Sequence, residues 1–351
     1  MASVKAITFQ GIQSLEFGDV PDPKIQDPDD VIVQVTAAGI CGSDLHPYFG
    51  RETGIDPGTV MGHEFVGRVV ERGSGVRTLK EGTRVVAPFT TSCGDCVYCR
   101  IGLTARCERG QLFGWVEEGY GLQGAQAERV RVPMAESTLV EVPTGLDDAV
   151  ALLAGDILST ALFGASLAGV SSGDLVVVVG CGPVGVLAVR AALERGARQV
   201  VAVDRVPSRL ALATVFGARA VDLDSGDPLA TVREFSGGRG ADCAIEAAGT
   251  PEATRLAAGL LRPGGSIGAV AVHTEGSLAL SPAELYDGNL RYATGRCSAR
   301  HYMPEALALA AADPHLFGAL ISHDLPLSKG VEAYRRFADR AEGWTKVVLR
   351  P

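Results

Sequence analysis

The stretch "SGDLVVVVGCGPVGVLAVRAALERGA", residues 172–197, decides the fold of the second part of the chain. A β-branched run at Val176–Val179 is typical of a buried strand, and an amphipathic helix pattern ends the stretch. Between them, Gly180, Gly182 and Gly185 form a G-x-G-x-x-G motif. Such glycines permit a tight turn and the close approach of a pyrophosphate, which then faces the positive end of the helix. The stretch therefore predicts a dinucleotide site in an α/β sheet.

The next apolar run, "QVVAVD", ends at Asp204, where an acid is expected to bind the adenosine ribose. A carboxylate at this place repels a 2′-phosphate, so the sequence favours NAD over NADP. Arg205 follows and weakens this preference, because a neighbouring arginine can accept the phosphate. The other residues that we expect to contact the cofactor are Thr160, Pro183, Val184 and Arg209.

Two kinds of hydrophobic pattern divide the chain. After the glycine motif, strand patterns such as "GADCAIEAAG" alternate with helix patterns such as "PEATRLAAGLL", which predicts a doubly wound parallel sheet. Before it, "DVIVQV" and "GRVVERG" alternate apolar and polar residues, as antiparallel strands do. The sequence therefore predicts two domains, with the change of pattern near residue 155. Cys181, Cys243 and Cys297 are expected to be packed residues without a metal role.

The composition limits what the protein can bind. The chain has 351 residues, of which 46% are apolar, so two domains with large cores are expected. The formal net charge of −9 argues against nucleic acid or an anionic membrane as the main partner. The most apolar stretch, Leu175–Val189, is too short and too interrupted by glycine and proline to span a membrane. The N-terminus lacks the apolar core of a signal peptide, so we expect a cytoplasmic protein.

Four cysteines lie close together in "CGDCVYCRIGLTARC", residues 93–107. A reducing cytosol disfavours disulfides, so a metal site is the better interpretation. Four thiolates close a tetrahedral shell around zinc and leave no position for a substrate. An iron–sulfur cluster is the alternative, although the last spacing and the absence of a following proline fit it less well. Unligated thiols remain the third possibility. The predicted structural zinc ligands are Cys93, Cys96, Cys99 and Cys107.

Three other segments carry potential metal ligands. These are Cys41 in "AAGICGSDLHPY", His63 and Glu64 in "MGHEFVGRVVE", and Asp156 in "LLAGDILSTALFGA". A single cysteine or histidine is more often a packed residue than a ligand. Asp156 also suits a helix N-cap, because an apolar run follows it. Together with a closed four-cysteine loop, however, the segments form a strong set.

This set of motifs, in this order, resembles the zinc-dependent medium-chain dehydrogenase/reductase family, that is, the alcohol dehydrogenases. The resemblance covers essentially the whole chain and implies a GroES-like, mainly antiparallel catalytic domain and a Rossmann domain. The implied boundaries are 1–155 for the first part of the catalytic domain, 156–297 for the Rossmann domain and 298–351 for a return to the catalytic domain. It also implies two zinc ions per chain, one structural and one catalytic.

The resemblance assigns the catalytic zinc to Cys41, His63 and Asp156, with Glu64 as a fourth ligand or beside the metal. An aspartate at that third position is found in part of the family, including formaldehyde dehydrogenase-like members. The family pattern further implies that the Ser43 hydroxyl bonds the substrate oxygen. The proton then passes through the nicotinamide ribose to an imidazole at His46, and such a group titrates near neutral pH.

The resemblance also implies roles for one lysine and three aromatic residues. Lys346 lies where the family carries a basic residue for the cofactor pyrophosphate, and a solvated surface lysine is an equal alternative. The substrate pocket is expected between the domains, lined by Tyr48, Phe89 and Trp115, although core packing is the commoner role of any one aromatic. Such a lining suits a neutral alcohol or aldehyde. The resemblance also implies a homo-oligomer, a tetramer or a dimer.

Three functions follow from the sequence. The first is an NAD- and zinc-dependent alcohol dehydrogenase acting on a small molecule. The second is a formaldehyde dehydrogenase or dismutase-like enzyme, or a polyol dehydrogenase. The third is a nucleotide-binding protein without activity on the same scaffold, because a fold alone does not prove chemistry. The third function does not require Cys41, Ser43, His46, His63 and Asp156 to occur together.

Overall fold

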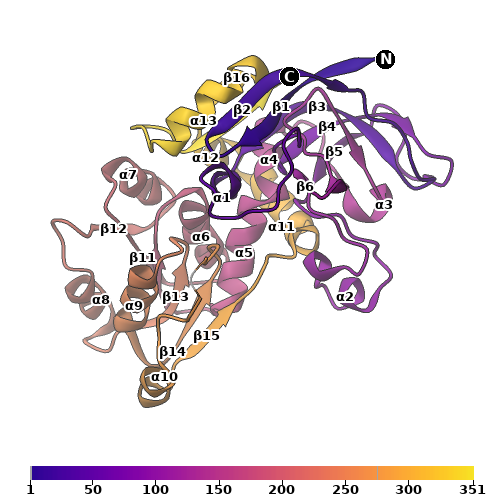
Figure 1. The fold of residues 1–351 in the computed structure, drawn as a ribbon. Helices are drawn as coiled ribbons and strands as arrows, with labels where there is room; N and C mark the ends of the chain where they lie inside the picture. The colour runs from indigo at the N-terminus through magenta and orange to yellow at the C-terminus, as the bar shows by residue number, and fades with distance from the viewer. Residues whose placement is uncertain (1, 275) are drawn as a thin grey trace. The chain divides into compact units, whose positions relative to one another are not determined.

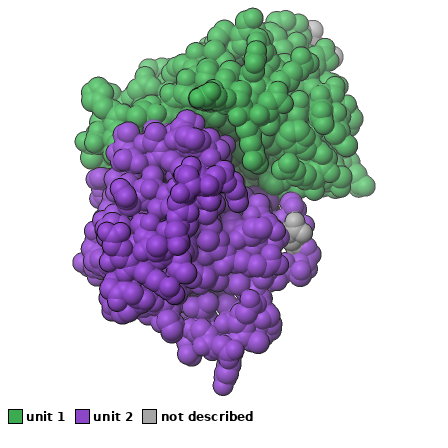
Figure 2. Space-filling model, turned by 90° about the vertical axis from the view of Figure 1, so that its left-hand side faces the viewer, with its two compact units in different colours: residues 1–159, 298–351 green, residues 160–297 purple. Residues whose placement is uncertain are grey.

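The computed structural model describes residues 2–274 and 276–351, and they form two compact units (Figures 1 and 2). Unit 1 contains the residues up to Ser159 together with Ser298–Pro351, and unit 2 is Thr160–Cys297. Helix α5 (Ile157–Leu167) runs through the boundary between them. The boundary therefore lies inside a helix, a few residues after the change of pattern in the sequence.

Unit 2 contains a six-stranded parallel sheet in the order β12-β11-β10-β13-β14-β15. Its strands are β10 (Leu175–Val179), β11 (Gln199–Asp204), β12 (Arg219–Asp222), β13 (Ala241–Glu246), β14 (Leu261–Ala269) and β15 (Arg291–Thr294). Its helices are α6 (Pro183–Glu194), α7 (Pro207–Val215), α8 (Pro228–Ser236), α9 (Pro251–Leu260) and α10 (Pro282–Gly288). The chain reverses its direction of strand addition between β10 and β13, which is where an open α/β sheet binds its ligand. The predicted doubly wound sheet is confirmed.

The core of unit 2 explains why the first strand of this sheet reads as one apolar run. All five residues of β10 are buried, because β11 and β13 flank it and helices cover the sheet (Figure 1). A strand that is buried on both faces has no solvent side to mark with polar residues. The glycine motif follows β10 directly and therefore lies at the carboxyl edge of the sheet.

Unit 1 is built on a mainly antiparallel seven-stranded sheet, in the order β16-β17-β3-β4-β5-β9 with β8 paired to β3. Its strands are β3 (Val31–Ile40), β4 (Phe65–Arg72), β5 (Arg84–Ala87), β8 (Arg129–Val132), β9 (Val140–Glu141), β16 (Ile321–Pro326) and β17 (Lys346–Arg350). Two hairpins lie outside this sheet: β1 (Ser3–Gly11) with β2 (Ser14–Pro21), and β6 (Trp115–Glu117) with β7 (Tyr120–Leu122). The predicted antiparallel first domain is confirmed.

The helices of unit 1 are short near its loops and longer in the C-terminal part. They are α1 (Leu45–Tyr48), α2 (Val97–Arg100), α3 (Ala135–Thr138), α4 (Asp148–Gly155), α11 (Ala299–Ala312), α12 (Pro314–Gly318) and α13 (Gly330–Ala338), with 3₁₀ turns at Gly42–Asp44, Thr104–Arg106 and Leu327–Lys329. The C-terminal strand β17 pairs antiparallel with β3, so that Val347 lies opposite Ile40. This pairing brings the end of the chain to the segment that carries Cys41.

Among the residues that the structure describes, one helical stretch, Asp148–Leu167, is long and apolar enough to cross a membrane. It comprises α4 and α5 rather than the apolar stretch singled out in the sequence. Its most apolar window is 83% buried inside the protein. A helix with this burial is a core helix, so its hydropathy is explained by packing.

Candidate metal and dinucleotide sites

Four donor side chains from distant segments of unit 1 meet in one place, which we call the open group: Cys41, His63, Glu64 and Asp156. One ligand atom from each lies within 4.8 Å of all the others. Oδ2 of Asp156 lies 3.4 Å from Cys41 Sγ and 3.4 Å from His63 Nε2. The structure therefore brings together all four residues that the sequence proposed as ligands.

The sheet explains how these donors meet. Cys41 follows the last residue of β3, and Glu64 precedes the first residue of β4. Because β3 and β4 pair antiparallel, with Ala38 opposite Phe65, the two ends lie side by side. Asp156 stands where α4 ends and α5 begins, and its carboxylate faces Cys41 and His63. This orientation favours the ligand interpretation of Asp156 over a helix cap.

Glu64, one of the four donors, forms a buried ion pair with Lys346. Each side chain is only 1% exposed, and Lys346 Nζ also donates to the Ile40 carbonyl at 3.2 Å. A Cβ on Gly39 would overlap Glu64 Oε2 and lie 3.1 Å from Lys346 Nζ, so only glycine lets the pair lie against β3. The surface alternative for Lys346 is therefore wrong, because pairing of β17 with β3 buries it. Its contact with a pyrophosphate stays a prediction.

The open group fits a divalent cation. Glu64 Oε1 is buried and has no hydrogen-bond partner in residues 2–274 and 276–351. A buried carboxylate oxygen without a donor is costly unless a cation reaches it. The donor set of one thiol, one imidazole and carboxylates is of the kind that zinc takes. One thiolate and one carboxylate also balance the two charges of the ion.

The pKa values of the donors reflect burial and crowding. Burial, together with the charges of Asp156 and Glu64, raises the pKa of the Cys41 thiol to about 11. Burial also raises the pKa of Glu64 to about 7. Burial lowers the pKa of His63, but the charge of Asp44 and hydrogen bonds to Asp156 and Asp44 outweigh it and hold this pKa well above its usual range. Protons and a cation therefore compete for the same atoms, and metal binding must release protons.

Asp44 also belongs to this group of contacts, and the sequence reasoning missed it. Its Oδ1 lies 3.1 Å from His63 Nδ1, and its Oδ2 accepts a hydrogen bond from the Cys41 backbone N–H at 2.9 Å. A carboxylate behind a histidine ligand fixes the orientation and tautomer of the ring. The signal was present in "CGSDLH", because an acid three residues after a ligand and just past a strand is poised for this contact.

The structure places the predicted Ser43 and His46 around the open group in different ways. Ser43 Oγ lies 3.2 Å from Cys41 Sγ and 3.3 Å from His63 Nε2, so it stands among the donors. His46 lies in the short helix α1, and its Nδ1 is buried without a hydrogen-bond partner among the described residues. Burial lowers the pKa of His46, which keeps its ring neutral at pH 7.

The three predicted pocket aromatics are distributed unequally. The Phe89 ring stands edge-on to His63, with their centroids 6.3 Å apart. Tyr48 is buried, and its ring centroid lies 6.0 Å from that of Tyr334. Trp115 packs against the cluster around Ile7 and Met61. Phe89 therefore lies beside a predicted ligand, whereas Trp115 takes a packing position.

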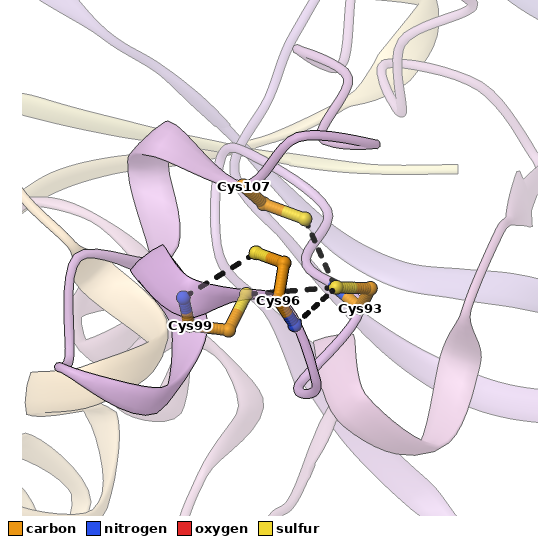
Figure 3. Close-up of side chains that lie close together, drawn as sticks. All are labelled: Cys93, Cys96, Cys99 and Cys107. Carbon is orange, nitrogen blue, oxygen red and sulfur yellow. Dashed lines mark hydrogen bonds between the residues drawn. The ribbon is translucent and has the colours of Figure 1, made fainter.

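The four-cysteine loop forms a second, separate donor group, the closed group (Figure 3). Figure 3 shows its sulfurs turned toward one another; Cys93 Sγ and Cys99 Sγ are 3.9 Å apart. Zinc–sulfur bonds of about 2.3 Å in a tetrahedron place sulfurs about 3.8 Å apart, so the loop is shaped for one ion. A cluster of several irons would hold its ligands further from one another. All eight cysteines are free of disulfides.

Backbone N–H groups surround these sulfurs. Cys93 N–H donates to Cys107 Sγ, Cys96 N–H to Cys93 Sγ, and Cys99 N–H to Cys96 Sγ, at 3.2, 3.3 and 3.5 Å. Backbone hydrogen bonds from Glu108 and Cys99 lower the pKa of Cys96 to about 6. Because the thiolate is the form that binds metal, this loop favours the ligand state of Cys96.

Several residues predicted to bind the dinucleotide lie at the carboxyl edge of the sheet in unit 2. Gly180 has φ +91°, a conformation that favours glycine, and Gly182 caps α6 with Pro183 in its first turn. The Asp204 carboxylate accepts hydrogen bonds from the backbone N–H groups of Cys181 at 2.6 Å and Arg205 at 2.7 Å. It is therefore held at the turn where the cofactor's ribose is expected.

Arg205 is ion-paired with Asp224, a contact that the sequence did not reveal. Asp222, on β12, lies opposite Asp204 in the sheet register and adds another carboxylate to this edge. Thr160 is buried in α5, whereas Val184 and Arg209 lie in the first turns of α6 and α7. The structure thus places the predicted residues Gly185, Val184 and Arg209 around the same edge.

Comparisons with known proteins point to one family. A family model described as the alcohol dehydrogenase GroES-like domain matches residues 27–144, and one described as zinc-binding dehydrogenase matches residues 183–312. The chain is 47% identical over 278 residues to the medium chain reductase/dehydrogenase ucsI of Acremonium sp., covering 77% of this chain and 94% of that protein. It is 42% identical over 342 residues to zinc-type alcohol dehydrogenase B of Aspergillus flavus, and this match covers 95% of this chain and 78% of that protein.

Solved structures extend the likeness to the whole chain. Alcohol dehydrogenase TADH from Thermus sp. ATN1 superposes with a TM-score of 0.92 at 38% identity, and the match covers 99% of both chains. A zinc-binding dehydrogenase from Sinorhizobium meliloti 1021, solved with NADP, superposes with a TM-score of 0.86 at 30% identity and full coverage of both. Both units are therefore shared with these proteins.

Proposed function

Because the chain belongs to the zinc-dependent medium-chain dehydrogenase/reductase family and is an alcohol oxidoreductase, we propose that it transfers hydride between a small alcohol and NAD at the open group. The observation that carries the proposal is the meeting of Cys41, His63, Glu64 and Asp156 within 4.8 Å. We propose that Cys41, His63 and Asp156 hold a catalytic zinc. Glu64 is then the fourth ligand when no substrate is present. The closed group then holds the second, structural zinc.

Zinc bound at the open group supplies a Lewis acid that makes an alcohol proton easier to remove. The chain's own residues do the rest. Ser43 Oγ, placed between Cys41 Sγ and His63 Nε2, is positioned to bond the substrate oxygen and accept its proton. Burial lowers the pKa of His46 and so favours its neutral ring, which is the form that can take up that proton. The alcohol carbon loses a hydride to the nicotinamide, so each turnover yields one carbonyl product, one reduced cofactor and one proton.

The charges at the ribose end of the cofactor site support NAD. Asp204 and Asp222 lie side by side at the ends of β11 and β12, and a 2′-phosphate would meet both carboxylates. Arg205, the residue that can attract this phosphate, is paired with Asp224. Related solved structures carry either cofactor: the Sinorhizobium meliloti protein is bound to NADP, and an alcohol dehydrogenase (rspB) of Escherichia coli CFT073 is complexed with NADH.

A kinetic comparison of the two cofactors tests this proposal. We expect kcat/KM to be at least about tenfold higher with NAD than with NADP. In Asp224→Asn, Arg205 is free to meet a phosphate, so the ratio should move several-fold toward NADP. Glu332→Gln, which removes the same charge from an exposed pair in unit 1, should leave the ratio unchanged. A wild-type preference for NADP would overturn the proposal.

A second candidate substrate is formaldehyde. The chain is 37% identical over 268 residues to the glutathione-independent formaldehyde dehydrogenase of Pseudomonas aeruginosa LESB58. The sequence segment around Asp156 also resembles such enzymes, and polyols are a further class, since a butanediol dehydrogenase shares the fold at 27% identity. NAD reduction measured with short, aromatic and secondary alcohols, polyols and formaldehyde separates these substrates. Zinc binding with no turnover on the whole panel would favour the non-catalytic alternative.

The last part of the proposal concerns the oligomeric state of the enzyme and its location in the cell. We propose a cytoplasmic homo-oligomer, a dimer or a tetramer, from the resemblance to the family. Light scattering during gel filtration measures the mass of the assembly directly. A mass equal to that of one chain, 36.5 kDa, would contradict this proposal.

A further inference from the structure

A chain of buried polar side chains connects the C-terminal helix α13 to the open group. The Tyr334 hydroxyl donates to Gln126 Oε1 at 2.9 Å, and Gln126 Nε2 donates to the Gly39 carbonyl at 2.9 Å. The same Nε2 lies 3.4 Å from Asp44 Oδ2, and Asp44 Oδ1 lies 3.1 Å from His63 Nδ1. Tyr334 and Gln126 are fully buried, and Asp44 is 4% exposed.

The order of donors and acceptors along this chain is fixed. Since a hydroxyl and a main-chain carbonyl bracket Gln126, its amide oxygen must face Tyr334 and its NH₂ must face Gly39 and Asp44. Asp44 faces the backbone N–H of Cys41 at 2.9 Å and Gln126 Nε2 at 3.4 Å, and its Oδ1 lies 3.1 Å from His63 Nδ1. Because a carboxylate accepts hydrogen bonds, Nδ1 of His63 is the donor in this contact. His63 is thereby held in the tautomer that leaves Nε2 free for a metal.

Packing reinforces the same arrangement. Gly62, the residue before His63, has φ +89°, and a Cβ there would lie 2.8 Å from Gln126 Cδ and 2.9 Å from its Nε2. The amide thus rests directly on the backbone that carries the ligand. Tyr334 lies in an apolar cluster with Ile7 and Leu349, where a phenylalanine would pack without a hydroxyl to satisfy. Core packing alone does not account for a tyrosine and a glutamine in this place.

We propose that Tyr334 and Gln126 are positioning residues for His63, through which the C-terminal segment sets the orientation and tautomer of this ring and so the retention of zinc at the open group. The inference rests on the proposed metal site. It adds to that site two residues that are far from the ligands in the sequence, on α13 and on the segment before β8. Neither residue touches the substrate or the cofactor in this proposal.

Tyr334→Phe tests the inference, because it removes the hydroxyl and keeps the buried ring. In the holoenzyme we expect chelator to remove zinc from the open group about three- to tenfold faster than in the wild type, less than for Asp44→Asn, which removes the direct partner of His63. Cobalt(II) exchanged into the enzyme gives a second readout. The open group supplies one thiolate and the closed group four, so their visible bands differ, and only the band of the open group should change.

Thr254→Val is the control, because it removes a buried hydroxyl and its 3.3 Å bond to the Thr250 carbonyl in unit 2. It should lower the stability without changing zinc release or the cobalt band. If Tyr334→Phe also leaves release and band unchanged while lowering the stability, its role is structural and the inference is overturned. If the wild-type enzyme binds one zinc per chain and has no activity, the proposed function fails and the inference with it. Two zinc ions, an active enzyme and unchanged release in Tyr334→Phe overturn the inference alone.

Discussion

The closed and open donor groups of unit 1 differ in how they are built. The closed group draws its ligands from one loop, residues 93–107, and its four cysteines are partly exposed. In the open group, Cys41 and Asp156 alone are separated by 115 residues, and most of the donors are buried. Bringing distant residues together costs more chain entropy than closing a short loop. The local group can be ordered by its metal, whereas the dispersed group must be arranged by the fold.

The ion pairs at the two groups also differ in their exposure to solvent. The closed group is flanked by Arg109 and Asp95, an exposed pair at 2.8 Å with side chains 58% and 68% exposed. In the open group, Glu64 is itself paired with Lys346, and each of these side chains is 1% exposed. Exposed pairs contribute about 0–1 kcal/mol, whereas breaking a buried pair costs about 3–5 kcal/mol. Five predictions use this contrast to test the two groups, from the largest effect to the smallest.

Cys41→Ser removes the thiolate of the open group. We expect zinc content to fall from two ions per chain to one, and kcat/KM to fall at least about 1,000-fold, that is, by about 4 kcal/mol of transition-state stabilisation. The fold should survive, because the sheet and not the metal arranges this site. Elemental analysis measures the zinc content, steady-state kinetics measures kcat/KM, and circular dichroism reports on the fold. Full activity in the variant would remove Cys41 from the catalytic site.

Cys96→Ser opens the closed group. We expect loss of the other zinc and a fall of about 4 kcal/mol in the free energy of unfolding, part of the roughly 10–16 kcal/mol that structural zinc supplies to peptides that fold around it. The molecules that remain folded should keep their zinc at the open group and their activity. Unchanged zinc content would contradict the assignment of this loop.

Lys346→Met leaves Glu64 buried without its cation. The free energy of unfolding should fall by about 3 kcal/mol, and Glu64→Gln in the same chain should restore part of it. Denaturant unfolding of both variants and of the wild type measures these differences. A loss below about 1 kcal/mol would place the pair among the weak surface contacts.

Glu64 also makes the stability of the zinc-free protein depend on pH. Its folded pKa of about 7 lies above its ordinary value of 4.5, so the folded state binds the extra proton. The stabilising contribution is complete below about pH 4.5 and is lost as the pH rises through 7. Unfolding of the chelated protein at pH 5 and pH 8 measures it, and Glu64→Gln should flatten this part of the profile. An equal pH dependence in Glu64→Gln would assign it to other groups.

Arg109→Gln is the counterpart of Lys346→Met at the closed group and should have the smallest effect. We expect little change in the free energy of unfolding, because water screens an exposed ion pair and replaces the lost partner. Zinc content should stay at two ions per chain. A loss as large as that of Lys346→Met would mean that exposure does not separate the two groups.

Local spacing was enough to predict much of this protein. The strand, glycine turn and helix around Gly180 and the four cysteines of the loop each form from neighbouring residues, so their pattern is visible in the sequence. The ligand types Cys41, His63 and Asp156 were also predicted, from motifs whose order resembles a known family. In each case the residues within one segment carry the signal.

The tertiary structure alone decided how the open group is supported. Tyr334 bonds a residue 208 positions away, Lys346 one 282 positions away, and Gln126 reaches Asp44 across 82 positions. These contacts depend on the pairing of β17 with β3 and on the packing of α13, and no spacing within a segment encodes them. The sequence thus predicted which side chains would bind zinc and a dinucleotide. The fold determined which buried partners hold them, because burial makes a hydrogen bond or a charge pair between distant residues strong.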